Sequence, residues 1–65
     1  MQRTGARKVH NIDAYRAAKR LTTFFGDMAA TVAIARAMRA FEEGDRSRYA
    51  QWRHVVEEIR AWQAA

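Results

Sequence analysis

Gly26-Asp27 and Gly44-Asp45 are the two dipeptides that interrupt an otherwise helix-favouring sequence. Glycine readily adopts the left-handed conformation that ends many helices, because it has no Cβ to clash with the backbone. The aspartate that follows can accept hydrogen bonds from the free amides at the start of the next helix. The two dipeptides therefore predict tight corners between consecutive helices.

The runs on either side of these corners predict helices over about 12–25, 28–43 and 46–63. The chain contains no proline to break them. Short corners place consecutive helices side by side in opposite directions. We therefore predict an all-α fold, a compact antiparallel three-helix domain over residues 11–65, preceded by a flexible basic arm over residues 1–10.

Apolar side chains recur at three- and four-residue spacing in the first and third predicted helices. The stripes consist of Ile12, Tyr15, Ala18, Leu21 and Phe25 in the first helix, and of Tyr49, Trp52, Val55, Val56, Ile59 and Trp62 in the third. Asn11 or Asp13 is expected to cap the first helix. The second helix is rich in alanine, whose small side chain lets helices approach closely, so we expect this helix to be the central one.

The chain is short, and its size limits how stable it can be alone. A domain of 65 residues buries only about 60% of the surface of its unfolded chain. Hydrophobic residues make up 49% of the sequence, which is enough for one core. The absence of cysteine excludes disulfides and thiolate metal sites. A protein partner or a homodimer is therefore expected.

No segment of the sequence predicts a membrane span or a secretory leader. The longest apolar stretch, residues 28–35, is far shorter than the roughly twenty residues that a span needs. The basic residues near Met1 are not followed by an apolar stretch of the kind found in signal peptides. These features favour a cytoplasmic location.

The net charge of +5 is concentrated near the N-terminus. The candidate contacts for phosphates or an acidic partner are Arg3, Arg7, Lys8, Arg16, Lys19 and Arg20. The last three share one helix face, and such a set could bind nucleic acid in a salt-dependent way. The alternative is a solvated polar face. Ala40 and Gly44 have helix-turn-helix spacing, but Arg53 falls where that motif needs an apolar residue.

The sequence offers almost no residues for catalysis. Ser47 is the only serine and there is no cysteine, so a nucleophile has few candidates. His54 lies three and four residues before Glu57 and Glu58, but a zinc site needs further ligands on the same face. We therefore expect no enzyme activity, no metal and no cofactor.

Two apolar residues late in the chain are candidates for docking a protein. Trp62 lies in the last turn of the third predicted helix, close to Ile59. Aromatic side chains dominate the energetics of protein interfaces, so this pair could form a docking site. The alternative is that Trp62 folds back over the first helix.

A series of motifs follows in order along the chain: the run Ile12-Asp13-Ala14-Tyr15-Arg16-Ala17-Ala18-Lys19-Arg20-Leu21, then Gly26, Ala29, the Arg-Ala steps after Ala35, Gly44-Asp45, Trp52 and Ile59. This series resembles short uncharacterised all-helical proteins of alphaproteobacteria. The resemblance covers about residues 12–63. Many of those proteins have histidine before the first glycine, where this chain has Phe25. The resemblance implies a small cytoplasmic helical protein and supplies no activity.

Taken together, these patterns predict a small non-catalytic binding or adaptor protein. It would act through its helix faces, on a protein partner or by self-association. The alternative is a nucleic-acid-binding accessory protein that uses the basic arm and the first helix. Active-site residues commonly lie on loops, and the tight corners leave little loop in this chain.

Overall fold

The computed structural model describes the backbone of residues 2–64 and the side chains of residues 13–64. Helix α1 spans Gln2–Phe25, the short 3₁₀ turn η1 spans Gly26–Met28, α2 spans Ala29–Glu42 and α3 spans Arg46–Ala64. No strand occurs between residues 2 and 64. The predicted all-α class is confirmed. In the same part of the chain, no helix combines the length and the apolar character that a membrane span requires.

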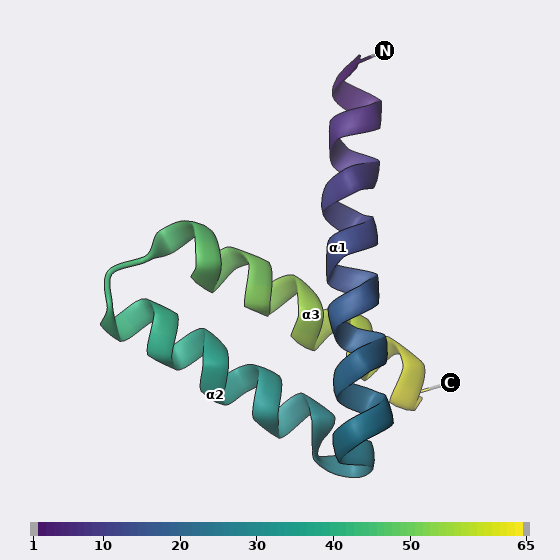
Figure 1. The fold of residues 1–65 in the computed structure, drawn as a ribbon, viewed down its shortest axis with the longest axis vertical. Coiled ribbons are helices and arrows are strands. Elements are labelled where there is room, and N and C mark those ends of the chain that lie inside the picture. Colours follow the sequence, from purple (N-terminus) through teal and green to yellow (C-terminus); the bar gives the residue numbers. More distant parts are fainter. Residues whose placement is uncertain (1, 65) are drawn as a thin grey trace.

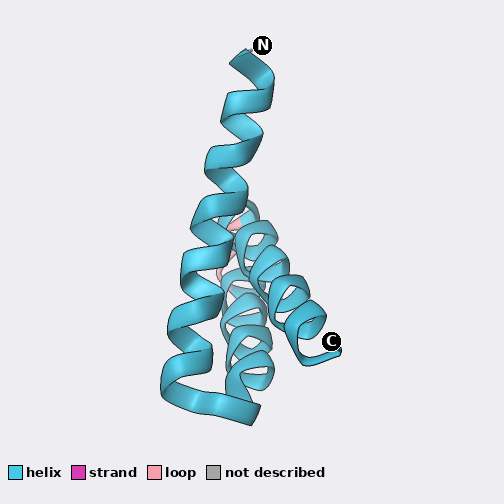
Figure 2. Cartoon of the chain, turned by 90° about the vertical axis from the view of Figure 1, so that its right-hand side faces the viewer, coloured by secondary structure: helices cyan, strands magenta, loops and turns pink. Residues whose placement is uncertain are grey.

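Helices α2 and α3 form a close antiparallel hairpin, and α1 lies across it (Figure 1). The N-terminal half of α1 extends beyond the hairpin in both views (Figure 2). The radius of gyration is 12.1 Å, close to the value of about 11 Å for a compact chain of this length. The shortest dimension is 17 Å, which corresponds to two layers of helices.

The helix at the centre of this arrangement is α3. It packs along α2 over the length of the hairpin, and it also makes most of the contact with α1. Helices α1 and α2 diverge from the turn that joins them and touch less. The expectation that the alanine-rich helix is central is therefore wrong. Small side chains allow α2 to lie close to one neighbour, but they do not place it between two.

The corner at Gly44 has the predicted geometry. Gly44 has a φ of +76°. Its amide donates a hydrogen bond to the Phe41 carbonyl at 3.0 Å, and the Asp45 amide donates one to the Ala40 carbonyl at 2.9 Å. These two bonds are the Schellman arrangement that closes a helix C-terminus. The Oδ1 atom of Asp45 then accepts a hydrogen bond from the Arg48 amide at 3.0 Å, which caps α3.

The corner at Gly26 has the predicted glycine conformation but not the predicted cap. Gly26 has a φ of +54°. Asp27 lies inside η1, and the N-cap of α2 is Met28, which makes no side-chain capping bond. The prediction that Asp27 caps the second helix is therefore wrong. The extra 3₁₀ turn, closed by the Ala29 amide on the Gly26 carbonyl, moves the start of α2 beyond the reach of the aspartate.

Helix α1 begins earlier than its capping signals predict. Its first residue is Gln2, so Asn11 and Asp13 lie within the helix and do not begin it. Residues 2–10, which fall in the predicted arm, have helical backbone in this structure. This segment contains no proline, and its arginine, lysine and alanine residues favour helix, so the helical backbone continues through it. The side chains of this segment lie outside the described residues.

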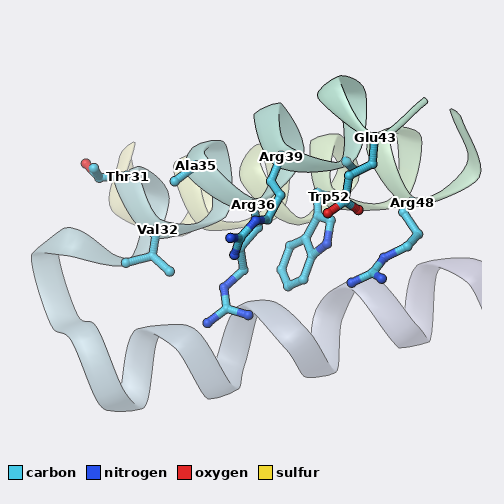
Figure 3. Close-up of a pocket in the computed structure, with 9 residues that line it drawn as sticks. Thr31, Val32, Ala35, Arg36, Arg39, Glu43, Arg48 and Trp52 are labelled. Carbon is cyan, nitrogen blue, oxygen red and sulfur yellow. The ribbon is translucent and has the colours of Figure 1, made fainter. Parts of the chain in front are cut away.

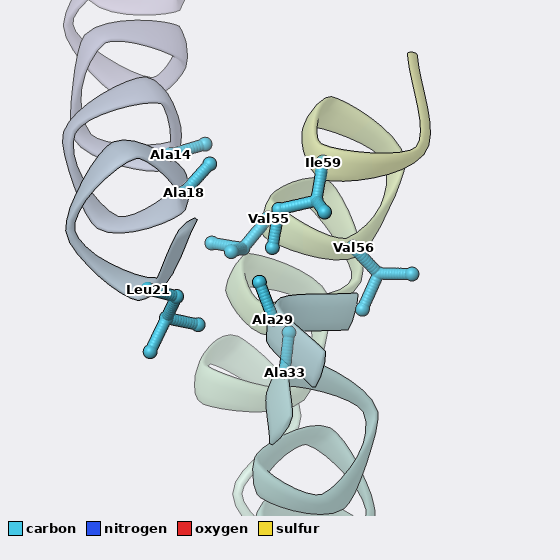
Figure 4. Close-up of a cluster of buried hydrophobic side chains, with 8 residues drawn as sticks. All are labelled: Ala14, Ala18, Leu21, Ala29, Ala33, Val55, Val56 and Ile59. Atoms are coloured by element: carbon cyan, nitrogen blue, oxygen red, sulfur yellow. The ribbon is translucent and has the colours of Figure 1, made fainter. Parts of the chain in front are cut away.

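The core is built mostly from small side chains (Figure 4). Its ten buried members are Ala14, Ala18, Leu21, Ala29, Ala33, Ala37, Ala40, Val55, Val56 and Ile59. Figure 4 shows that Ala14 and Ala18 point from α1 towards α3, and that Val55 points back at α1. Leu21 and Ala18 follow the predicted stripe of the first helix. Tyr15 and Phe25, which the stripe also included, are 46% and 43% exposed.

Candidate binding surfaces

The largest apolar side chains of the described residues lie mainly outside the core. Phe24 is 75% exposed, Phe41 is 70% exposed, and Met28 and Met38 are both more than half exposed. Six of the ten buried residues, in contrast, are alanines. Exposed large apolar residues that gather in one place mark interaction sites more often than single scattered ones do. Two of these residues, Met38 and Phe41, lie on α2, where their neighbours on the α2–α3 hairpin can be described in detail.

The buried alanines of α2 separate two surfaces of different chemistry. Successive residues of an α-helix are rotated by about 100°. Ile34, Met38 and Phe41 each follow a buried alanine by one position, so they lie on one flank of α2. Arg36 and Arg39 each precede a buried alanine by one position, so they lie on the opposite flank.

The first surface, which we call the hairpin face, is apolar with a basic edge. It comprises Ile34, Met38, Phe41 and Tyr49, with Arg46, Arg53 and Arg60 at its edge. Asp45 also lines it, and its carboxylate is engaged in capping α3. Two shallow hollows of about 200 and 470 Å³ lie along it and share Tyr49.

Tyr49 organises the aromatic part of the hairpin face. Its ring lies 5.6 Å from that of Phe41, centroid to centroid. The Nη1 atom of Arg53 donates a hydrogen bond to the Tyr49 hydroxyl at 3.1 Å, and the Arg53 guanidinium lies 6.0 Å from the ring centroid. One tyrosine therefore links the apolar centre of the face to its charged edge.

The second surface, which we call the arginine groove, lies on the other side of the hairpin. It comprises Arg36, Arg39 and Arg48 around Trp52, with the carboxylate of Glu43 among them, and has a volume of about 750 Å³ (Figure 3). The guanidinium carbon of Arg36 lies 5.5 Å from the centroid of the Trp52 ring, within cation–π range. Figure 3 shows Arg36 and Arg48 on either side of the tryptophan, both extending from the hairpin towards α1.

Of the basic residues predicted from the sequence, the three with described side chains lie on α1 and line neither surface. Arg16, Lys19 and Arg20 are all exposed. Arg20 precedes the buried Leu21 by one position, which places it on the flank of α1 that contains Ala17, and Ala17 lines a small hollow next to Trp52. The other candidates predicted from the sequence were Arg3, Arg7 and Lys8, and their side chains lie outside the described residues.

The structure separates the two residues that were predicted to dock a protein. Ile59 is only 1% exposed and belongs to the core, so its side chain is not on the surface. Trp62 is half-buried, and its ring packs edge to face on Tyr15 of α1 at 5.4 Å. Trp62 thus takes the alternative position, folded back over the first helix.

The side chains that the sequence offered for metal binding lie on α3. His54 and Glu57 are exposed on α3. No group of three or more potential ligands comes together within residues 13–64. The two surfaces differ in chemistry: one exposes apolar groups on one side of the hairpin, and the other gathers positive charge on the opposite side.

Sequence reasoning did not find the arginine groove. The spacing of Arg36 and Arg39 on one helix is a usable signal. Their position around Trp52 depends on how α2 and α3 are aligned in the hairpin, which periodicity alone does not determine. Comparison with known proteins gave no further guide, since no protein-family model, no curated protein and no solved structure matches this chain.

Proposed function

We propose that this chain is a small non-catalytic binding protein that docks another protein on its hairpin face. In this proposal the three helices act as one antiparallel unit, with α1 supporting the back of α3. The cytoplasmic location and the resemblance to the alphaproteobacterial proteins remain predictions from the sequence.

The observation that carries the proposal is the exposure of Phe41 and Met38, which are 70% and 58% exposed beside a core made mostly of alanine. Burying a side chain of this kind contributes about 2 kcal/mol. Covering both of them against a partner therefore adds up to about 4 kcal/mol, a substantial fraction of the roughly 3–10 kcal/mol expected for the stability of a 65-residue domain.

The edge of the hairpin face indicates the chemistry of the partner. Arg46, Arg53 and Arg60 border the apolar centre. Charged groups at the edge of an interface steer the encounter and select the partner. The segment that suits this face is an amphipathic helix with an apolar stripe flanked by glutamate or aspartate, since such helices bind in apolar grooves.

A designed peptide with the chemistry of the expected partner tests this proposal. The probe is a fluorescent amphipathic helix with leucines on one face and glutamates along its flanks, and the comparison peptide has lysines in place of the glutamates. We expect the acidic peptide to bind, and the double variant Met38→Ser/Phe41→Ser to weaken binding by about tenfold or more. The control variant is Phe24→Ser, which removes an equally exposed aromatic from another surface.

Three outcomes would contradict the proposal: no binding of either peptide, equal binding of both, or equal effects of the double variant and the control. Light scattering after size exclusion is run in parallel. Dimerisation that depends on Met38 and Phe41 would identify a second copy of the chain as the occupant and would replace the partner proposed here.

The nucleic-acid alternative is supported by the exposure of Arg16, Lys19 and Arg20 on one side of α1. A protein that neutralises phosphates loses affinity steeply as salt is added. If α1 carries such a function, changing these three residues to glutamate should abolish DNA and RNA binding at low salt. Unchanged affinity in that variant would remove this alternative.

A further inference from the structure

We propose that the arginine groove binds single-stranded nucleic acid, with its three arginines on phosphates and a base stacked at Trp52. This surface lies on the flank of α2 opposite the hairpin face. The inference is therefore independent of the protein-docking function, and either one can fail without the other. It also differs from the predicted α1 site in the residues that carry it.

The charge in the groove favours an anion. Arg36, Arg39 and Arg48 line it together with a single acidic residue, Glu43. The arginines come from both α2 and α3, so their guanidinium groups approach the groove from two helices (Figure 3). Guanidinium groups bind phosphate through paired, parallel hydrogen bonds, which makes arginine well suited to phosphodiesters.

The tryptophan in the groove favours a ligand that contains a nucleobase. Trp52 lines the groove and holds the Arg36 guanidinium 5.5 Å from its ring centroid. Bases of single-stranded nucleic acids stack on aromatic rings and on guanidinium planes, and stacking tolerates any base sequence. The pairing of Trp52 with Arg36 offers both kinds of surface at the same point. An acidic peptide would use the arginines but would gain nothing from this stacking surface.

The size and surroundings of the groove favour a strand over a free nucleotide. Its volume of about 750 Å³ lies within the range of about 300–1,000 Å³ for small-ligand sites, which is ample for one nucleotide unit. The α1 side chains that line the small hollow next to Trp52 are Asp13 and Ala17, whereas the three arginines of the groove itself come from α2 and α3. The phosphates on either side of a bound unit would therefore each meet a guanidinium group of the groove, which a mononucleotide does not exploit.

The first experiment compares two double variants that remove the same charge from opposite sides of the hairpin. The probe is a fluorescent ten-nucleotide oligothymidylate, and its affinity is measured by anisotropy at low salt. We expect Arg36→Gln/Arg48→Gln to weaken binding about tenfold or more, and Arg53→Gln/Arg60→Gln to weaken it less than threefold. Equal losses in the two variants, or no binding by the wild-type protein, would overturn the proposal.

The second experiment reports on the base. In a Trp62→Phe background, Trp52 is the only tryptophan, so its fluorescence reports on this groove alone. We expect quenching during titration with the oligothymidylate, and a much lower affinity for thymidine monophosphate. Binding without quenching, or equal affinity for the mononucleotide, would contradict a stacked single strand.

A substitution of Glu43 is expected to raise the affinity for the oligothymidylate, whereas the arginine substitutions lower it. Figure 3 shows the carboxylate of Glu43 beside Trp52, among the arginines of the groove, where it repels phosphate. Glu43→Gln is therefore expected to raise the affinity for the oligothymidylate about two- to threefold, while Glu57→Gln, an exposed carboxylate on α3 outside the groove, leaves it nearly unchanged. Equal gains in the two variants would show a general charge effect and would count against the groove.

Discussion

The ring of Tyr15 on α1 meets the ring of Trp62 on α3 edge to face, with 5.4 Å between the centroids and 76° between the planes. The two residues are separated by most of the described chain. Their contact joins the last turns of α3 to the middle of α1, beside the core contacts of Ala14 and Ala18. It is therefore a direct reporter of whether α1 is docked on the hairpin.

A double-mutant cycle measures the strength of this docking contact. We expect Tyr15→Leu and Trp62→Leu to be coupled by about 0.5–1.5 kcal/mol, the range for edge-to-face aromatic pairs. The measurement is urea unfolding of the wild type, the two single variants and the double variant. Additive effects would mean that the rings do not interact in solution.

The glycines at the two corners should resist substitution for a conformational reason. A Cβ at Gly44 would meet no atom within 4 Å, yet its φ is +76°. Gly44→Ala is therefore expected to lower the free energy of unfolding by about 1 kcal/mol through backbone strain alone. Gly44→Asn, which tolerates this conformation better, should cost less in the same chemical denaturation assay. An equal cost for both would point to another cause.

The two corner aspartates form a matched pair for testing the capping interaction. Asp45 accepts the Arg48 amide hydrogen bond, whereas Asp27 lies inside η1 and Met28 is the N-cap of α2. Asp45→Ala is expected to cost about 1 kcal/mol of stability. Asp27→Ala should change stability by less than about half of that. A larger loss at Asp27 than at Asp45 would contradict the assignment of the caps.

The alanine row of α2 should not accept larger side chains. Ala33 is 0% exposed and packs where α2 meets the rest of the core. Ala33→Leu is expected to lower the unfolding free energy by about 1–3 kcal/mol, because the helices must move apart to fit it. Ala35→Leu, at an exposed position of the same helix, should lie within about 0.5 kcal/mol of the wild type. Thermal and urea unfolding of both variants provide the comparison.

The corners and the helix ends near them could be predicted because their causes are local. The hydrogen bonds of Gly44 and Asp45 close the end of α2 and cap the start of α3, and each of them joins residues no more than five positions apart in the sequence. The same dipeptide at Gly26 predicts the same behaviour. There the inserted 3₁₀ turn displaces the cap, since several backbone paths can follow a left-handed glycine.

The face that α1 buries could be predicted only in part. Periodicity assigns Ala18 and Leu21 to the core, but it favours the large Tyr15 over the small Ala14 as the third member. The structure buries Ala14 and leaves Tyr15 at the edge, packed on Trp62. Periodicity weights a residue by its size and apolarity. Close helix crossings select small residues, and that preference becomes visible only when the neighbouring helix is in place.

The candidate binding surfaces could also be predicted only in part from the sequence. A list of apolar and basic residues on each helix follows from the sequence, but that list places Ile59 on the surface and does not reveal the grouping of Arg36, Arg48 and Trp52. These three residues come together because α2 and α3 are aligned side by side in the hairpin. Side-chain positions relative to a second helix depend on that alignment.

The amino-acid sequence by itself determined the all-helical class and the glycine corners of this protein, because both follow from local backbone preferences and short-range hydrogen bonds. Only the tertiary structure decided that α3 is central, that alanines form the core, and that the hairpin separates an apolar face from an arginine groove. These features depend on which helix surfaces approach each other, and the close fit of the alanines of α1 and α2 against Val55, Val56 and Ile59 of α3 sets that approach.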